Sequence, residues 1–464
     1  MQHIKRHDER RAPVPQAPAH SPYLSGNYAP VDREVTATDL AVTGRLPEAL
    51  SGRFIRNGPN PVLVTDGPYS WFGGDGMLHI VELDAGRARS YRNRWVRTPA
   101  VAGSLGEPVP AGPTSMTGID LSNTSTARLG GTVLSLTESC LPYVVTPDGA
   151  TVGRTDLGGG LTHGLSAHAK YDPVTREVHQ VAYSPLSDPF AVWQVIDATG
   201  RVTRTEPIDL PAPVMIHTVS LTARYVLVYD LPVVFDLALL TAGWSVPFRW
   251  DPSHQARLGL LERATGSIRW VDLPPVYVFH DAGAHDTPTG VVVDVVTYAR
   301  AFATDLGGPI DESTRLERWT VDVAGSTVER TVLDDRPQEF PRVAPGTFDR
   351  ANRFTYAIGA DRGDLATAFS TGNAVIRHDH RTGASDVWSP GRNRSVAEAV
   401  FVPDPERTSR EDGGWLMAFV HDVTTDHSQF VVLDAEEVDR GPVATVALPQ
   451  RVPVGFHGNW FADD

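Results

Sequence analysis

Cysteine pairs, an excess of basic residues and long apolar runs are all missing from this 464-residue sequence. The one cysteine, Cys140, excludes an internal disulfide and favours a reducing compartment. The formal net charge of −15, without a visible basic patch, argues against a nucleic-acid partner. No segment reaches the ~20 apolar residues of a membrane span, and the polar residues 1–11 lack the apolar stretch of a secretory signal. We therefore expect a cytoplasmic protein.

One stretch departs from this polar pattern, residues 231–248. Its large apolar side chains include Phe235, Leu237, Leu239, Leu240, Trp244 and Phe248. Core packing is the favoured interpretation, and a patch that dips into a membrane surface is the alternative. A peripheral membrane contact therefore stays open, and no obligate protein partner is evident.

The length alone suggests about three domains. However, no linker rich in Ser, Gly or charge divides the chain, and large all-β folds often run long as one unit. The hydrophobic content of 41% is enough for a sizeable core. We expect a single domain over residues 23–464, preceded by a disordered segment over residues 1–22.

A degenerate repeat recurs along the chain, in which a β-rich run is followed by an acidic residue near a Gly or Thr and then by another run. It is found at residues 83–86, 171–175, 196–200, 261–266, 321–325 and 378–383. Because Asp and Gly tolerate the positive φ of tight turns, each instance predicts a hairpin. Helical periodicity is scarce, and runs such as residues 291–296 are continuously apolar. The pattern favours a β-propeller over a sandwich or a doubly wound sheet, without giving the number of blades.

Signatures of several metal and nucleotide enzymes are absent. The chain has no His-Glu-x-x-His and no paired cysteines, and the glycines at 158–160 lack the Lys-Ser/Thr of a phosphate-binding loop. A zinc protease, a zinc finger and a nucleotide hydrolase therefore have no support.

Four histidines in apolar or aromatic settings are the strongest chemical signal: His168, His217, His280 and His457. Imidazole is the commonest neutral ligand of transition metals, and four from separate segments can meet only where a fold brings distant strands to one axis. Four neutral ligands leave up to two positions of an octahedral field open, which suits iron(II) beside O₂ and a substrate better than a closed zinc site. Taken singly, each histidine is more often an ordinary core or surface residue. The pair His378 and His380 overlaps a Thr-Gly turn, and we interpret it as a solvated hairpin end.

Histidine ligands usually donate their second ring N–H to a carboxylate. Three glutamates lie in apolar surroundings, where an unpaired carboxylate would be costly: Glu138, Glu339 and Glu398. A surface salt bridge or a strand end is the alternative for each.

Longer motifs follow one another in a fixed order, at residues 26–31 (GNYAPV), 50–61 (LSGRFIRNGPNP), 74–79 (GDGMLH), 91–98 (YRNRWVRT), 339–342 (EFPR), 401–403 (FVP) and 455–458 (GFHG). With these motifs the sequence resembles the carotenoid cleavage oxygenase family of nonheme iron enzymes, over nearly everything from residue 23 to residue 460. The resemblance implies an all-β, seven-bladed β-propeller, with loops and short helices capping the face that holds the active site.

The same resemblance assigns roles to individual residues. It makes the four histidines ligands of Fe(2+) and the three glutamates their hydrogen-bond acceptors. Thr124 matches a residue whose methyl group lies beside a vacant iron position, and Phe279 and Phe340 fall where relatives line the substrate tunnel. The implied reaction is cleavage of a C=C bond of a carotenoid or apocarotenoid by O₂, which gives aldehyde or ketone products.

The chain departs from the family pattern in ways that affect the expected substrate. Stilbene-cleaving relatives carry a Lys immediately before the glutamate that corresponds to Glu138, where this chain has Thr137. This difference favours an extended polyene over a 4-hydroxystilbene. The Asp-Phe common after the second ligand is replaced by Thr218-Val219. Cleavage of a stilbenoid or other aryl alkene, an isomerase-like activity, and a noncatalytic propeller that binds a partner remain the alternatives.

Overall fold

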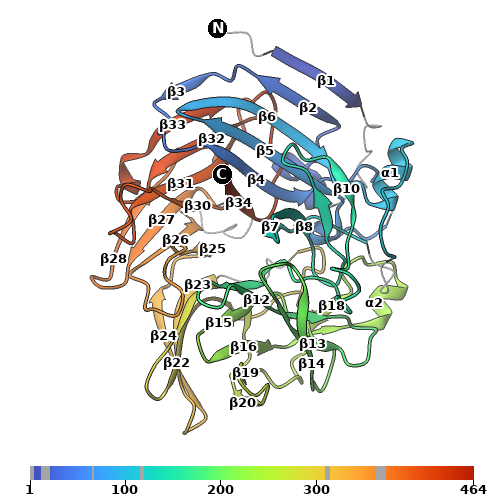
Figure 1. The fold of residues 1–464 in the computed structure, drawn as a ribbon, viewed down its shortest axis with the longest axis vertical. Helices are drawn as coiled ribbons and strands as arrows, with labels where there is room; N and C mark the ends of the chain where they lie inside the picture. The colour runs from blue at the N-terminus through green and yellow to red at the C-terminus, as the bar shows by residue number, and fades with distance from the viewer. Residues whose placement is uncertain are drawn as a thin grey trace.

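The computed structural model describes residues 5–11, 21–64, 67–114, 120–308, 314–360 and 372–463, with the side chains of residues 5–11 left out. Seven sheets surround a central axis, and the chain runs round them once, from the blue blade to the red one (Figure 1). The predicted all-β, seven-bladed propeller is confirmed.

Blades 1 to 4 form the first part of the ring. Within each blade the strands are named in the order in which they are hydrogen-bonded to one another. Blade 1 comprises β1 (Lys5–Arg11), β2 (Arg33–Thr38), β6 (Arg87–Trp95), β5 (Gly76–Asp84), β4 (Gly52–Pro59) and β34 (Gly458–Ala462). Blade 2 comprises β10 (Thr151–Arg154), β9 (Tyr143–Val145), β8 (Thr132–Leu136) and β7 (Ser125–Leu129). Blade 3 comprises β11 (Lys170–Asp172), β12 (Glu177–Tyr183), β13 (Ala191–Ile196) and β14 (Val202–Ile208). Blade 4 comprises β15 (Val219–Leu221), β16 (Tyr225–Asp230), β19 (Arg257–Glu262) and β20 (Ile268–Asp272).

Blades 5 to 7 complete the ring. Blade 5 comprises β21 (Tyr277–Asp286), β22 (Gly290–Tyr298), β23 (Thr314–Asp322) and β24 (Thr327–Asp334). Blade 6 comprises β25 (Gln338–Arg342), β26 (Phe354–Gly359), β27 (Ala374–Asp379) and β28 (Ala384–Trp388). Blade 7 comprises β29 (Arg394–Val396), β31 (Gly414–Asp422), β32 (His427–Asp434), β33 (Pro442–Ala447) and β3 (Val42–Gly44), and β30 (Val400–Pro403) also pairs with β31.

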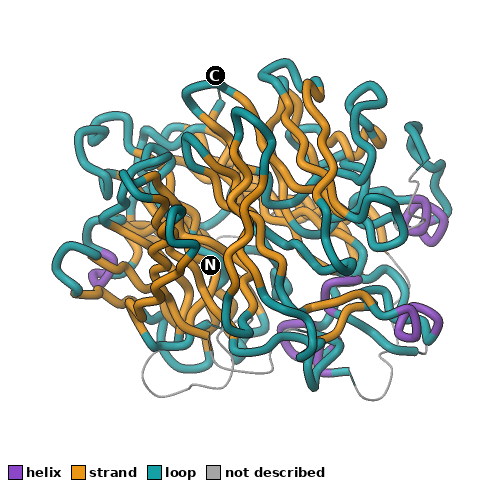
Figure 2. Tube along the Cα trace, turned by 90° about the horizontal axis from the view of Figure 1, so that it is seen from below, coloured by secondary structure: helices purple, strands orange, loops and turns teal. Residues whose placement is uncertain are grey.

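Helical segments are short and lie around the strands rather than between them (Figure 2). They are α1 (Pro99–Leu105), α2 (Leu237–Thr241) and the 3-10 turns η1 (Pro22–Leu24), η2 (Gly26–Tyr28), η3 (Trp71–Gly73) and η4 (Val438–Arg440). A separate hairpin of β17 (Val233–Phe235) and β18 (Phe248–Trp250) flanks α2. Among the described residues, no helix is both long enough and apolar enough to cross a membrane.

The ring is closed by strands from both ends of the chain. The C-terminal β34 pairs with β4 in blade 1, and the N-terminal β3 pairs with β33 in blade 7. Each pairing joins segments about four hundred residues apart in sequence. Blade 1 therefore takes in the C-terminal strand β34 and blade 7 takes in the N-terminal strand β3, so that the two ends of the chain are exchanged between the first and last blades and close the ring.

The predicted hairpin turns are confirmed where strands meet. The turn between β5 and β6 has Ala85 at φ 44° and Gly86 at φ 75°, the left-handed region that an Asp-Ala-Gly sequence allows. The predicted turns at 261–266 and 378–383 likewise join β19 to β20 and β27 to β28. Between the turns, β22 is buried along nearly its whole length, with Val292 alone among its residues half-buried, as its largely apolar run at residues 291–296 suggests.

The N-terminal segment, for which the sequence predicts disorder, is described only in part. Residues 1–4 and 12–20 lie outside the described residues, whereas Lys5–Arg11 forms β1 antiparallel to β2, and η1 begins at Pro22. Without β1, the strand β2 would be the outer edge of blade 1, and its unpaired backbone groups offer a template for a further strand.

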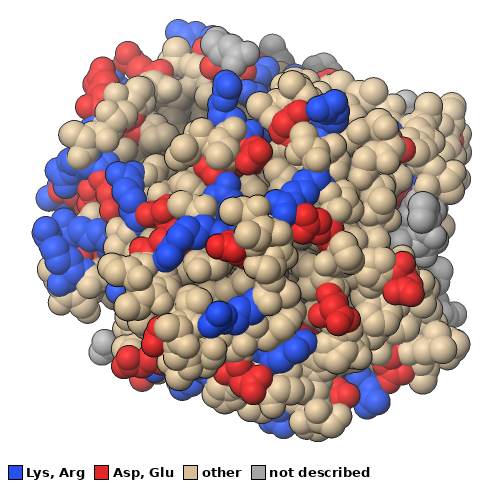
Figure 3. All heavy atoms as spheres, turned by 60° about the horizontal axis from the view of Figure 1, so that its bottom comes forward, with Lys and Arg blue, Asp and Glu red and all other residues tan. Residues whose placement is uncertain are grey.

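The apolar stretch 231–248 is only partly core. Leu231, Val233 and Phe248 are buried, as core packing predicts, but Leu237 at the start of α2 is 60% exposed. For Leu237 the core interpretation is therefore wrong. On the face that Figure 3 presents, acidic and basic side chains alternate, and neither sign gathers into a continuous patch.

Candidate metal centre

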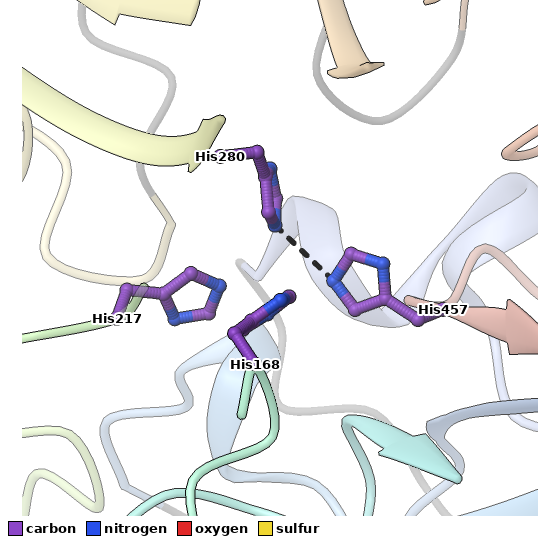
Figure 4. A group of neighbouring side chains, drawn as sticks. All are labelled: His168, His217, His280 and His457. Carbon is purple, nitrogen blue, oxygen red and sulfur yellow. Dashed lines mark hydrogen bonds between the residues drawn. The ribbon is translucent and has the colours of Figure 1, made fainter. Parts of the chain in front are cut away.

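The four predicted histidines meet at the propeller axis. One ligand nitrogen from each of His168, His217, His280 and His457 lies within 4.8 Å of the others. Their rings converge on one point (Figure 4). His168 and His217 each stand two residues before the innermost strand of their blade, β11 and β15. His280 lies within β21, and His457 immediately precedes β34.

The three predicted glutamates come from the remaining blades. Glu138 follows β8, Glu339 lies in β25, and Glu398 lies between β29 and β30. Their carboxylates approach the Nδ1 atoms of three ligands: Glu138 at 2.9 Å from His217, Glu339 at 2.6 Å from His280 and Glu398 at 2.8 Å from His457. Every blade thus contributes one histidine or one glutamate to the centre.

The Glu-Phe-Pro-Arg motif serves two of the ligands because its backbone bulges. Phe340 has φ 51°, and the pairing of β25 with β26 slips between Glu339 and Arg342. Glu339 binds His280 and also accepts a 2.9 Å hydrogen bond from Tyr298. Arg342 donates from Nε to Glu398 at 2.8 Å, and Glu398 holds His457.

Burial and charge set the protonation states at the centre. Burial, reinforced by the other three histidines, holds the pKa of His168 well below its ordinary value. Burial lowers the pKa of His457 to about 4, against the opposing effect of Glu398. For Glu398, burial favours the neutral form but is outweighed by Arg342 and His457, so its pKa is low. His168 and His457 are therefore neutral and Glu398 is ionised at neutral pH, the states that metal ligation requires.

The donor set fits a transition metal. The Nε2 atom of His168 is buried and has no hydrogen-bond partner among the described residues. The Nε2 atoms of His280 and His457 lie 3.1 Å apart, while their Nδ1 atoms are occupied by carboxylates. Buried nitrogens that face one another without further partners are costly unless a cation lies between them. The four histidines can therefore hold a metal ion.

The interpretation of His378 and His380 as a solvated hairpin end is wrong. His378 is 5% exposed and bonds Gln338 at 2.8 Å and Ser385 at 3.0 Å, and the His380 ring bonds Thr355 at 2.8 Å. The strand β27 extends to Asp379 and is covered by its neighbours β26 and β28, so the turn begins later than the sequence suggested. These two histidines are structural and are not part of the four-histidine group.

Thr124 lies beside the centre in a polar network. Its hydroxyl donates to Asn123 Oδ1 at 2.9 Å, and Thr137 donates to the same oxygen at 3.0 Å. The Asn123 amide in turn donates to the backbone oxygens of Phe72 and Gly74, at 2.8 and 2.7 Å. With its hydroxyl engaged, Thr124 has only its methyl group left to face the cavity. Asn123 was not singled out from the sequence, because a single Asn beside a Thr carries no distinguishing pattern.

An apolar pocket of about 80 Å³ reaches the centre from the side that carries η3 and the β17–β18 hairpin. Thr124, Thr137, Glu138 and His217 line its inner end, and the outer lining includes Phe72, Tyr183, Met215 and the segment 245–248. Phe279, a predicted tunnel residue, lies behind this wall: it is fully buried and stacks on Phe72 at 6.1 Å.

A second and larger cavity, the axial funnel, opens on the opposite side. It has a volume of about 780 Å³, and His168, His280 and His457 lie at its floor. Phe340, the other predicted tunnel residue, lines this funnel rather than the apolar pocket, and its ring stacks on His280 at 5.4 Å. The positive φ of Phe340 places its side chain on the funnel side, a backbone detail that the sequence does not reveal.

Comparison of the sequence with known proteins gives the family of this chain. The family model described as "Retinal pigment epithelial membrane protein" matches residues 28–462. A carotenoid cleavage oxygenase of Mycobacterium tuberculosis is 40% identical, over 96% of this chain and 98% of its own length. The protein belongs to the carotenoid cleavage oxygenase family.

Further relatives place the protein within this family. A carotenoid 9,10(9',10')-cleavage dioxygenase of Crocus sativus is 32% identical, over 95% of this chain and 88% of its own length. The solved structure of Pseudomonas brassicacearum lignostilbene dioxygenase matches with a TM-score of 0.84 at 25% identity, over 97% of this chain and all of the other. A Synechocystis apocarotenoid oxygenase variant matches with a TM-score of 0.82 at 25% identity, over 94% and 98%. As a member of the carotenoid cleavage oxygenase family, the protein is an enzyme, an oxidoreductase of the dioxygenase type.

Proposed function

We propose that the protein binds iron(II) through His168, His217, His280 and His457 and uses O₂ to cleave one C=C bond of a carotenoid or apocarotenoid. The observation that carries this proposal is the convergence of four imidazoles, three of them facing carboxylates, at the end of an apolar pocket. Iron(II) bound there would supply the activation of O₂.

The protein residues position the reactants and exclude water. Glu138, Glu339 and Glu398 fix the ring orientations and offset the charge of a bound cation. Thr124 presents a methyl group at the inner end of the pocket, where it restricts the room beside the centre. Phe72, stacked against Phe279 and Phe456, gives that pocket a rigid aromatic wall. These groups hold one double bond in place and keep the site dry.

The lining of the pocket supports a polyene as substrate. Among the described residues that line it there is no Lys or Arg, and Thr137 is engaged with Asn123. A phenolic substrate would bring a polar hydroxyl into this apolar space, where it needs a hydrogen-bond partner. An extended hydrocarbon needs none.

Cleavage of a stilbenoid is the second candidate. The overall likeness to a lignostilbene dioxygenase favours it, and the Tyr183 and Ser139 side chains in the lining offer polar contacts. Both reactions produce aldehydes, but a polyene and a stilbene give aldehydes of different mass. Analysis of the products therefore separates the two candidates.

The decisive experiment is incubation of the iron-loaded protein with carotenoids, apocarotenoids and stilbenes under ¹⁸O₂, followed by mass spectrometry. We expect labelled aldehydes from polyenes, with masses that locate the cleaved bond. The His280→Ala variant is the control and should yield none. Turnover of stilbenes alone would replace the first candidate by the second, and no oxygen incorporation from ¹⁸O₂ with any substrate would contradict both.

We also propose that the pocket mouth contacts a membrane surface peripherally. Leu186 and Leu237 are each 60% exposed, and each neighbours residues of the pocket lining or of the hairpin that supports it. An apolar substrate dissolved in a bilayer could enter without crossing water. In liposome flotation we expect the protein to rise with the vesicles, and a Leu186→Ser/Leu237→Ser variant to stay behind with its fold intact. Equal recovery of both proteins would contradict this docking.

A further inference from the structure

An ion pair joins segments that carry three of the four histidines. Lys170 Nζ lies 2.6 Å from Asp281 Oδ1, and Thr218 Oγ1 donates to the same oxygen at 3.2 Å. Lys170 follows His168 by two residues, while Thr218 and Asp281 directly follow His217 and His280. One carboxylate oxygen thus links side chains of blades 3, 4 and 5 next to the metal ligands.

His168 differs from the other ligands in how its ring is supported. Carboxylates contact the Nδ1 atoms of His217, His280 and His457, but no carboxylate contact to the His168 ring occurs among the described residues. Its segment is instead fixed on each side. Its backbone N–H donates to Ser166 Oγ at 3.1 Å, and Lys170 is held by Asp281.

The ion pair of Lys170 and Asp281 is largely shielded from solvent. The Asp281 side chain is 5% exposed and that of Lys170 is 27% exposed, and both line the axial funnel. A carboxylate this deeply buried needs partners, because desolvation penalises its charge. Two partners are present, and each belongs to a ligand-bearing segment of a different blade.

We propose that Asp281 is a positioning residue, which holds the His168 and His217 segments in register with His280 through Lys170 and Thr218 and so slows the loss of the metal. This inference rests on the metal centre of the proposed function. It concerns retention of the metal and is independent of which substrate is cleaved.

The test is the rate at which metal leaves the protein. The Asp281→Asn variant and the parent protein are loaded anaerobically with iron(II), and release to an excess of chelator is followed by absorbance. We expect release from the variant to be roughly 10-fold faster, the lower end of the 10- to 100-fold loss of metal affinity that follows removal of a ligand's direct partner, because Asp281 acts through neighbours of the ligands. The absorption spectrum of the cobalt(II)-loaded variant should also change, because the ligand geometry relaxes.

A matched control separates this role from general stabilisation. Asp294 and Arg318 form an ion pair at 2.7 Å in blade 5, with exposures of 2% and 29%, and neither belongs to the four-histidine group. Asp294→Asn should lower thermal stability to a similar extent and leave the release rate unchanged. Should Asp281→Asn fail to fold, Lys170→Met removes the same pair from its more exposed side and should give the same fast release.

Rescue tests the geometry. Thr218 lies close enough to Asp281 that a carboxylate at position 218 can reach Lys170. We expect Thr218→Asp, added to Asp281→Asn, to restore slow release. Equal release rates for Asp281→Asn, Asp294→Asn and the parent would overturn the inference, whereas a parent protein that takes up no iron would contradict the proposed function itself.

Discussion

Replacing Glu398 by Gln tests whether the carboxylates hold the ligands. Glu398 is 3% exposed and accepts from three donors, His457 Nδ1, Arg342 Nε and the Gly458 backbone N–H, each at 2.8 Å. Glutamine keeps the shape but turns one of the two terminal oxygens into a donor. At least one of the three hydrogen bonds then becomes a contact between two donors, and Arg342 loses its counter-charge.

The expected magnitude follows from these contacts. Loss of a hydrogen bond to a charged group costs about 1.5–3 kcal/mol, and a buried donor left without a partner costs about 1–3 kcal/mol more. The Arg342 side chain is 31% exposed, so water in the funnel offsets part of its share. We therefore expect the free energy of unfolding of the metal-free protein to fall by about 3 kcal/mol and iron affinity to fall roughly 10- to 100-fold.

The assay compares two variants. Guanidinium unfolding gives the change in stability, and competition with a chelator gives the iron affinity. Glu317→Gln is the control, because Glu317 is equally buried and is held by Trp319 and Arg330, away from the centre. It should lose stability and keep its iron affinity. Equal iron affinity in Glu398→Gln and Glu317→Gln would refute the reasoning.

Three further predictions concern substrate choice, acid stability and packing. Thr137→Lys should gain turnover of 4-hydroxystilbenes in product assays, because it places a cation in the pocket, and an unchanged substrate profile would remove the basis for preferring a polyene. Burial, reinforced by nearby arginines, lowers the pKa of His79 to about 3, below its value in the unfolded chain. As the pH falls below about 6.5, the unfolded chain takes up a proton on this histidine and the folded protein does not, so the free energy of unfolding declines. His79→Gln should therefore lose about 3 kcal/mol less than the parent between pH 7 and pH 4.5 in urea unfolding, and parallel losses would contradict this. A Cβ on Gly58 would lie 2.7 Å from the Cα of Gly455, two residues before the ligand His457, so Gly58→Ala should lower both iron content and melting temperature. Gly103→Ala is the control, because its Cβ would meet nothing within 4 Å, and it should lower neither.

The sequence predicted the parts of this molecule that depend on local chemistry. A hairpin turn is specified by a few residues with the right φ, and an apolar setting marks a histidine or glutamate as unusual wherever it occurs. The turn at Gly86 and the group of four histidines could therefore be anticipated. The number of blades could not be obtained from the degenerate repeat and came only from the family resemblance.

Features that depend on distant pairing were beyond the sequence. His378 looked solvated because its neighbours form a turn, but two flanking strands bury it. The side of the centre on which Phe340 lies depends on a single backbone angle, which no residue pattern at 339–342 announces. The pairing of β34 with β4 joins residues about four hundred apart, and only the closed ring brings them together.

The closed ring also explains why the ligands can be so far apart in sequence. Each blade brings its inner strands to the axis, so a residue near the end of one of these strands reaches the centre whatever the length of the loops elsewhere. Three blades supply glutamates in place of histidines, and the glutamates approach ligands of other blades: Glu138 approaches His217, Glu339 approaches His280 and Glu398 approaches His457. Each such contact crosses between blades, as does the contact of Lys170 with Asp281. Binding of a metal and closure of the propeller must therefore stabilise one another, because each bond to the centre also holds two blades together.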